Sequence, residues 1–143
     1  MKALVVDDNE DLRFLIGRLL VIEGFEIAEA GDGGSAIAAI DAGPRFDLVL
    51  LDVQMPVVDG WHALEAIRGR AEFDDVRVVM CTVKGRSDDL IRGWELGCDG
   101  FIAKPFDIDA FRHEIREVMT RDDSARRTIR AAEIRRARAA ASS

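Results

Sequence analysis

Three aspartates directly follow apolar runs, at positions where a charged side chain is unusual. Asp52 follows four aliphatic residues at 48–51, and Asp7 and Asp8 follow a mostly apolar run at 1–6. Unbroken runs of this kind are typical of strands buried on both faces of a parallel sheet. A carboxylate is costly inside such a sheet but is tolerated at its carboxyl edge, where open α/β folds bind ligands. The pattern therefore predicts that the three acids share one edge of a sheet.

Two further polar side chains end apolar runs in the same way. Thr82 follows residues 78–81, and Lys104 follows residues 101–103 and precedes a proline. Carboxylates that converge on one edge can hold Mg²⁺, which takes carboxylate and phosphate oxygens as ligands. A lysine beside them is a point charge that attracts phosphoryl oxygens. The set predicts a site for a divalent cation and a phosphoryl group.

The elements that must position these residues alternate between strand and helix patterns. Strands are expected over about residues 3–7, 26–30, 48–51, 76–81 and 100–103, and helices over about 10–22, 34–41, 60–67, 87–96 and from 107 onward. This alternation is typical of successive βαβ units in an α/β protein. Right-handed crossovers favour a doubly wound parallel sheet. The strand order 2-1-3-4-5 would place the first and third strands side by side and bring the three aspartates together.

Length and composition indicate one ordinary globular domain. The chain has 143 residues, of which 48% are hydrophobic and 33% charged, enough for one core. Cys81 and Cys98 lack metal-ligand spacing and are expected to be reduced, buried hydrophobes. No apolar stretch approaches the length of a bilayer span, and the first residues lack a signal-peptide pattern. A cytoplasmic protein without membrane contact is therefore expected.

Charge is distributed unevenly along the chain. The formal net charge of −7 divides into −11 for residues 1–120 and +4 for residues 121–143, which carry seven arginines. An acidic body argues against direct nucleic-acid binding, which needs a surface that neutralises phosphates.

The motifs resemble the receiver domain of two-component response regulators. The matching pieces are VVDDNE at 5–10, LLDVQMPVVDG at 50–60, Thr82, and KPF at 104–106. The resemblance covers residues 1–120 and implies a flavodoxin-like (βα)₅ fold of the chemotaxis-receiver kind. It also implies that a histidine kinase or a histidine phosphotransfer protein donates a phosphoryl group to this chain, which acts as a signalling switch and not as an enzyme.

The resemblance implies a role for each residue of the set. Asp52 is the phosphoacceptor. Mg²⁺ (or Mn²⁺) is bound directly by Asp8, through water by Asp7, and by Asp52 and the backbone carbonyl of Gln54. Lys104 contacts the phosphoryl oxygens and forms a cis peptide bond with the proline that follows it.

Two other residues are implied to transmit the modification. Thr82 donates its hydroxyl to the phosphoryl group and moves inward, and Phe101 rotates into the vacated space. The face formed by the fourth helix, fifth strand and fifth helix then changes, and an unknown downstream protein reads it. Taken singly, these residues have plainer interpretations: Asp7 and Asp8 as helix caps, Thr82 as a strand former, and Phe101 as core packing.

Three residues near the acceptor are expected to tune the phosphoryl lifetime. Val83 follows Thr82 where the family usually has alanine or glycine, so its extra methyl groups should narrow access to the phosphoryl group. Gln54 and Lys84 occupy positions at which an acid could orient a hydrolytic water, and neither is an acid. Together they predict a phosphoryl group that is long-lived for the family.

Residues 121–143 form an arginine- and alanine-rich tail in which Ile129 and Ile134 are the only large aliphatics. Alanine and arginine favour helix, so the tail is expected to extend the fifth helix. A solvated or frayed helix is the favoured interpretation. The alternative is a coiled-coil seam that forms a homodimer or docks a partner.

The leading hypothesis is a stand-alone phosphorylation-driven switch with no DNA-binding or enzymatic output of its own. A receiver fragment that lacks its output domain is the first alternative. A hydrolase with an aspartyl-phosphate intermediate would need a second acid where Gln54 stands, and the complete acidic set argues against a pseudo-receiver. A DNA-binding regulator would use the arginine tail, but no helix-turn-helix is visible.

Overall fold

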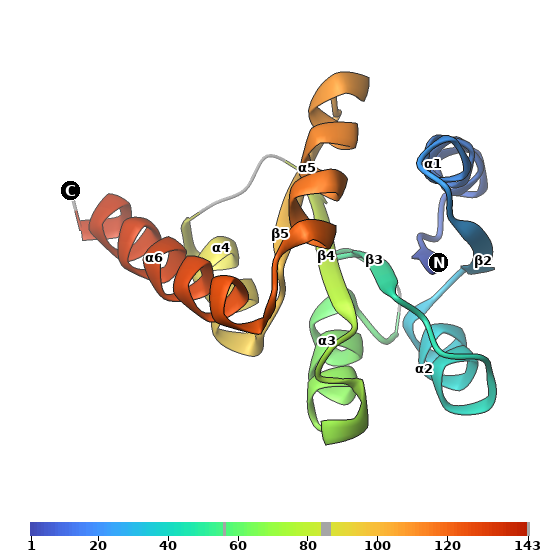
Figure 1. Ribbon diagram of the computed structural model, residues 1–143, viewed down its shortest axis with the longest axis horizontal. Helices are drawn as coiled ribbons and strands as arrows, with labels where there is room; N and C mark the ends of the chain where they lie inside the picture. Colours follow the sequence, from blue (N-terminus) through green and yellow to red (C-terminus); the bar gives the residue numbers. More distant parts are fainter. Residues whose placement is uncertain (56, 84–86, 143) are drawn as a thin grey trace.

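Strands and helices alternate along the chain and build one parallel sheet with helices on both faces (Figure 1). The computed structural model describes residues 1–55, 57–83 and 87–142. The strands are β1 (Lys2–Val6), β2 (Glu26–Ala30), β3 (Leu48–Asp52), β4 (Arg77–Val83) and β5 (Gly100–Lys104). The helices are α1 (Glu10–Ile22), α2 (Gly33–Ala42), α3 (Gly60–Arg68), α4 (Ser87–Leu96), α5 (Ile108–Thr120) and α6 (Asp123–Ser142), with a 3₁₀ turn η1 (Ala71–Phe73).

The strand order is β2-β1-β3-β4-β5 and every pairing is parallel, as the sequence predicts. Because β1 and β3 are neighbours with Val6 opposite Leu51, the residues that follow them reach the same edge. Val83 pairs with Lys104 at the corresponding end of β4 and β5. This topology brings the ends of four strands to the edge that the acids occupy.

Two apolar clusters fix the sheet between its helical layers. Helices α1 and α5 cover one face, and α2, α3 and α4 cover the other (Figure 1). Residues 48–51 of β3 are all buried and alternate between the two clusters. A shift of one residue in register would exchange the two side-chain sets between faces. The position of Asp52 at the strand end is therefore strongly determined.

Side-chain caps begin the helices that flank this edge. The side chains of Asp59 and Asp107 cap α3 and α5 by accepting the backbone N–H groups of His62 and Ala110 at 3.0 and 2.9 Å. Helix α1 is capped by Asn9. The plainer interpretation, in which the preceding aspartates are caps, is therefore wrong, and those carboxylates are available for other contacts.

The tail does not continue α5 as predicted. Helix α5 ends at Thr120, Arg121 is extended, and Asp122 starts α6 by accepting the Ala125 N–H at 2.8 Å. Helix α6 folds back and packs on α4 (Figure 1). Helix propensity governs local conformation only, whereas buried contacts of α6 with the domain determine its direction.

The favoured solvated or frayed tail is also wrong. Ile129 and Ile134 pack against the apolar cluster beneath α2, α3 and α4. The buried residues of α6 are Arg126 and Ala137, so the helix packs partly through an arginine and not through an entirely apolar seam. Apolar spacing alone does not predict that α6 packs through an arginine.

Other expectations from the sequence hold with small changes in boundary. Strands β4 and β5 extend to Val83 and Lys104. Cys81 and Cys98 are free and buried, and burial raises the pKa of Cys81 to about 12. Among the helices in the described part of the chain, none is long and apolar enough to traverse a bilayer.

Gly60 provides a test of how closely α3 packs on the end of β3. A Cβ there would lie 2.3 Å from the Asp52 carbonyl oxygen and 3.0 Å from Val53 Cα. We expect Gly60→Ala to lower the free energy of unfolding by about 2 kcal/mol, because backbone atoms must move. Urea denaturation measures the change.

The matched control is Gly34→Ala in α2, where the new Cβ would meet only the Asp32 carboxylate at 3.5 Å. This variant should be unchanged or up to about 1 kcal/mol more stable, because alanine favours helix. Equal losses in both variants would contradict the close approach at Gly60.

Candidate functional site

Three aspartates meet at the carboxyl edge of β1 and β3. One carboxylate oxygen from each of Asp7, Asp8 and Asp52 lies within 4.8 Å of the others. Asp7 and Asp52 are 2% and 7% exposed, whereas Asp8 is exposed to solvent. The structure thus brings together the acids that the sequence placed on one edge, with one of them open to the outside.

Lys104 reaches this cluster from the end of β5. Its Nζ lies 2.8 Å from Asp7 Oδ2 and 3.1 Å from Asp52 Oδ2. The Lys104–Pro105 peptide bond is cis, as the family resemblance implied. One ammonium group therefore bridges two buried carboxylates that come from different strands.

Burial and charge act in opposite directions at this bridge. Burial raises the pKa of Asp52, Lys104 counteracts the rise, and the charge of Asp7 adds to it. For Lys104, burial alone would lower the pKa, but its contacts with Asp7 and Asp52 outweigh burial and raise it. Lys104 is therefore a permanent positive charge at neutral pH, and it does not by itself neutralise three carboxylates.

Backbone groups orient the two buried carboxylates. Asp7 Oδ1 accepts the Asn9 N–H at 2.9 Å, and Asp52 Oδ1 accepts the Gln54 N–H at 3.2 Å. Arg13 of α1 donates to the Asp7 carbonyl at 2.6 Å. In both aspartates the second oxygen faces Lys104, so each side chain is held from two sides.

An open cleft of about 900 Å³ lies beside the cluster. Its lining includes Asp8, Gln54, Trp61, Thr82, Val83 and Arg92. Thr82 is buried and donates its hydroxyl to the Val83 carbonyl at 3.2 Å, whereas Val83 is 63% exposed. Three of the predicted residues, Gln54, Thr82 and Val83, therefore border one cleft, and Lys84 lies outside the described residues.

Phe101 does not join the acid cluster but faces the same side of the sheet as Thr82. Met80 is opposite Phe101, and Thr82 stands two residues after Met80 on β4. Residues two apart share a face of a strand. The Phe101 ring meets the Trp94 ring edge-on at 5.9 Å, and its Cζ would lie 2.3 Å from a Cβ at Gly93. The ring therefore rests on α4.

Sequence reasoning did not find Arg92. This residue of α4 places its guanidinium over the buried Trp61 ring, 5.0 Å from the centroid, at the rim of the cleft. Arginine on a helix carries no sequence signal for such a site. The contact depends on the packing of α3 beside α4.

The donor set fits a hard divalent cation. All three candidate ligands are carboxylates, and with Lys104 charged the cluster retains two net negative charges. Mg²⁺ prefers oxygen donors and keeps several waters, which the exposed side of Asp8 allows. The site therefore fits Mg²⁺, the cation that the family resemblance implies.

The fold and this edge together define a class: a doubly wound α/β domain whose strand ends carry three carboxylates beside a lysine. Residues 3–116 match the family model of the response regulator receiver domain. The chain belongs to this family, and α6 lies beyond the matched residues.

Curated relatives agree with this assignment. The transcriptional regulatory protein CpxR of Escherichia coli K12 is 38% identical over 120 residues, covering 84% of this chain and 50% of the relative. The regulatory protein VanRc of Enterococcus gallinarum is 41% identical over 105 residues, covering 73% of this chain and 44% of the relative. The chain thus spans about half the length of these curated relatives.

Solved structures give the same result. The chemotaxis protein CheY4 of Vibrio cholerae superposes with a TM-score of 0.76 at 29% identity, covering 82% of this chain and 97% of that chain. The receiver domain of NtrX from Brucella abortus has a TM-score of 0.73 at 32% identity, covering 84% of this chain and 99% of that chain. The flavodoxin-like receiver fold is thereby established.

Asp8 tests the cation site. Asp8→Asn should weaken Mg²⁺ binding by at least about tenfold, because affinity at such sites follows the number of anionic ligands. Isothermal titration calorimetry measures the dissociation constant. Asp11→Asn, in the first turn of α1 and outside the cluster, is the control and should bind as wild type does. Equal affinity for Asp8→Asn and wild type would contradict the site.

Proposed function

We propose that this chain is a phosphoacceptor switch in which Asp52 receives a phosphoryl group from a phosphohistidine. The donor would be a histidine kinase or a histidine phosphotransfer protein. The observation that carries the proposal is the position of Asp52, at the end of a buried strand, within 3.1 Å of the Lys104 ammonium and beside two further carboxylates.

The transfer needs a nucleophile and charge neutralisation. A carboxylate oxygen of Asp52 attacks phosphorus and forms a P–O bond while the P–N bond to imidazole breaks. The imidazole keeps the electron pair and takes a proton from solvent. Lys104 offsets the charge of the phosphoryl oxygens, and the Gln54 N–H fixes the carboxylate orientation.

The ligands of Mg²⁺ or Mn²⁺ would be Asp8, Asp7, Asp52 and the backbone carbonyl of Gln54. The bound cation would supply the positive charge that an approaching phosphoryl group needs beside three carboxylates. Asp8 would be the ligand exposed to solvent, because Asp7 and Asp52 are buried.

The same geometry supports a pathway by which phosphorylation of Asp52 would change the surface of the domain. The Thr82 hydroxyl, which donates to the Val83 carbonyl, would turn to the phosphoryl group. Phe101, on the same side of the sheet, would move into the space that Thr82 leaves. The face formed by α4, β5 and α5 then changes, and a downstream protein reads it.

A switch fits the site better than an aspartyl-phosphate hydrolase does. Such a hydrolase places a second catalytic acid two residues after its nucleophile, and Gln54 occupies that position here. Its side chain is exposed and lines the cleft. Turnover of the phosphoryl group should accordingly be slow.

Incubation with acetyl phosphate and Mg²⁺ tests the proposal. Intact mass spectrometry should show one added phosphoryl group on wild type and none on Asp52→Asn, because the nucleophile is lost. Asp75→Asn removes an exposed acid far from the cluster and should be modified as wild type is. Uptake by Asp52→Asn at the wild-type level would contradict the assignment of the acceptor.

Val83 tests control of the lifetime. Val83→Ala should shorten the half-life of the phosphoryl group about threefold, a barrier change of under about 1 kcal/mol, because water reaches the cleft more easily. Intact mass followed over time after removal of acetyl phosphate gives the half-life. Val21→Ala, an exposed valine on α1, should leave it unchanged. Equal half-lives for Val83→Ala and wild type would exclude the steric effect.

A further inference from the structure

Helix α6 lies outside the residues that match the receiver family, yet it is packed onto the domain. Its inward side is a stripe at helical spacing, whose members are buried or partly buried: Arg126, Ile129, Arg130, Glu133, Ile134 and Ala137. Arg127 and Arg135 lie on the exposed side. The helix is thus amphipathic, with arginine in its buried stripe.

The buried Arg126 pairs with Asp99, the residue directly before β5. Arg126 donates from Nε to Asp99 Oδ1 at 2.7 Å and from Nη2 to Oδ2 at 3.2 Å. Asp99 is 3% exposed and also accepts Arg68 Nη2 at 2.9 Å and the Val78 N–H at 3.0 Å. A bidentate pair of this kind is geometrically specific. It fixes the start of α6 against the sheet.

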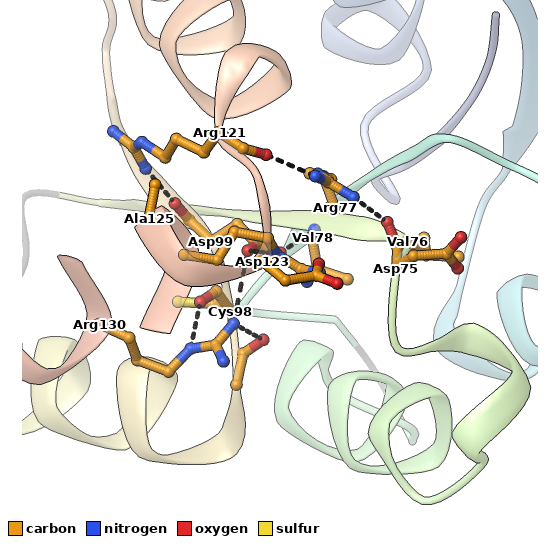
Figure 2. Close-up of polar contacts among 12 residues, drawn as sticks. Asp75, Val76, Arg77, Val78, Cys98, Asp99, Arg121, Asp123, Ala125 and Arg130 are labelled. Carbon is orange, nitrogen blue, oxygen red and sulfur yellow. Dashed lines mark hydrogen bonds and ion pairs between the residues drawn. The ribbon is translucent and has the colours of Figure 1, made fainter. Parts of the chain in front are cut away.

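A second set of contacts ties α6 to the end of α4. Arg130 donates to the Cys98 carbonyl at 3.1 Å (Figure 2). It also donates to the Gly97 carbonyl at 3.0 Å. These carbonyls follow the last turn of α4, where positive charge is favourable. Arg138 pairs with Glu95 farther along α6. The contacts therefore continue from Asp99 along much of the helix.

An aromatic pair lies beneath these contacts. A cavity of about 290 Å³ between the helices is lined by Trp94, Phe101, Glu114, Ile129 and Glu133. Trp94 is only 7% exposed and meets Phe101 edge-on. Helix α6 therefore covers part of the α4–β5 face, the same face on which the proposed function depends.

We propose that this α4–β5 surface, with Asp99 at its base and Trp94 and Phe101 at its centre, is a docking site for an arginine-bearing amphipathic helix. Its occupant in the unphosphorylated protein is α6, and phosphorylation of Asp52 releases α6. The second part rests on the proposed function. A partner then gains access to the surface that α6 had covered.

Phe101 links the two events. Its ring touches the α4 backbone at Gly93, meets Trp94, and borders the same cavity as Ile129 of α6. When this ring moves toward Thr82, the support beneath α6 is withdrawn. Phosphorylation thus changes the affinity of the surface for α6, as coupling between two sites requires.

Hydrogen exchange of the full chain, with and without acetyl phosphate and Mg²⁺, tests this docking. Phosphorylation should speed exchange of the amides of residues 123–142 about tenfold and leave β3 amides unchanged. Intact mass of the same samples gives the phosphorylated fraction. Without phosphorylation, Arg126→Ala should raise α6 exchange by at least about tenfold, because Asp99 loses its bidentate partner.

Two variants complete the design. Ala137→Glu places a charge in the buried stripe without touching Asp99 and should also release α6. If Arg126→Ala loses protection in β3 as well, the exchange of α6 in Ala137→Glu is the deciding measurement. Arg135→Ala, on the exposed side of the same helix, should leave α6 protected. Release by Arg135→Ala equal to that by Arg126→Ala would overturn the role of the Arg126–Asp99 contact in holding α6.

Other outcomes separate this inference from the proposed function. A fully phosphorylated protein with unchanged α6 exchange would overturn release of α6 while leaving Asp52 as acceptor. Absence of phosphoryl uptake by mass would overturn the proposed function, and the trigger for α6 with it. Protection of α6 that falls on dilution would place α6 on a second copy of the chain and overturn the intramolecular docking.

Discussion

The contact of Lys104 with two buried carboxylates is the interaction on which the functional edge depends. Asp7 and Asp52 come from different strands and would repel each other in a site that excludes most water. One ammonium, within 2.8 and 3.1 Å of them, holds them together, and Asp8 adds the excess charge that attracts a cation. The edge therefore keeps a negative charge, as the proposed cation site requires.

A single strand connects this edge with the surface of the domain. Asp99 precedes β5 and anchors α6, Phe101 lies within β5 against α4, and Lys104 ends β5 at the acidic cluster. At about 3.3 Å per residue, the anchor and the lysine are on the order of 17 Å apart. A rearrangement around Phe101 therefore acts midway between the site of chemistry and the helix that covers the α4–β5 face.

Much of the fold follows from local patterns. The aliphatic residues 48–51 predict a strand buried on both sides, and the acid that follows them predicts its end at a ligand-binding edge. The caps Asp59 and Asp107 were predictable because a short acidic side chain before a helix satisfies free N–H groups. Arg92 was not, since its contact with the Trp61 ring depends on how two helices pack.

The sequence alone located the strand ends to within two residues, and it determined which charges stand at those ends and that residues beyond 121 favour helix. Only the tertiary structure decided where that last helix goes. Its direction depends on Arg126 meeting Asp99, 27 residues away along the chain, inside a buried network that local propensity does not encode. From the sequence alone, an arginine is expected to be exposed to solvent. It is buried only where a carboxylate faces it, and the fold determines where that carboxylate lies.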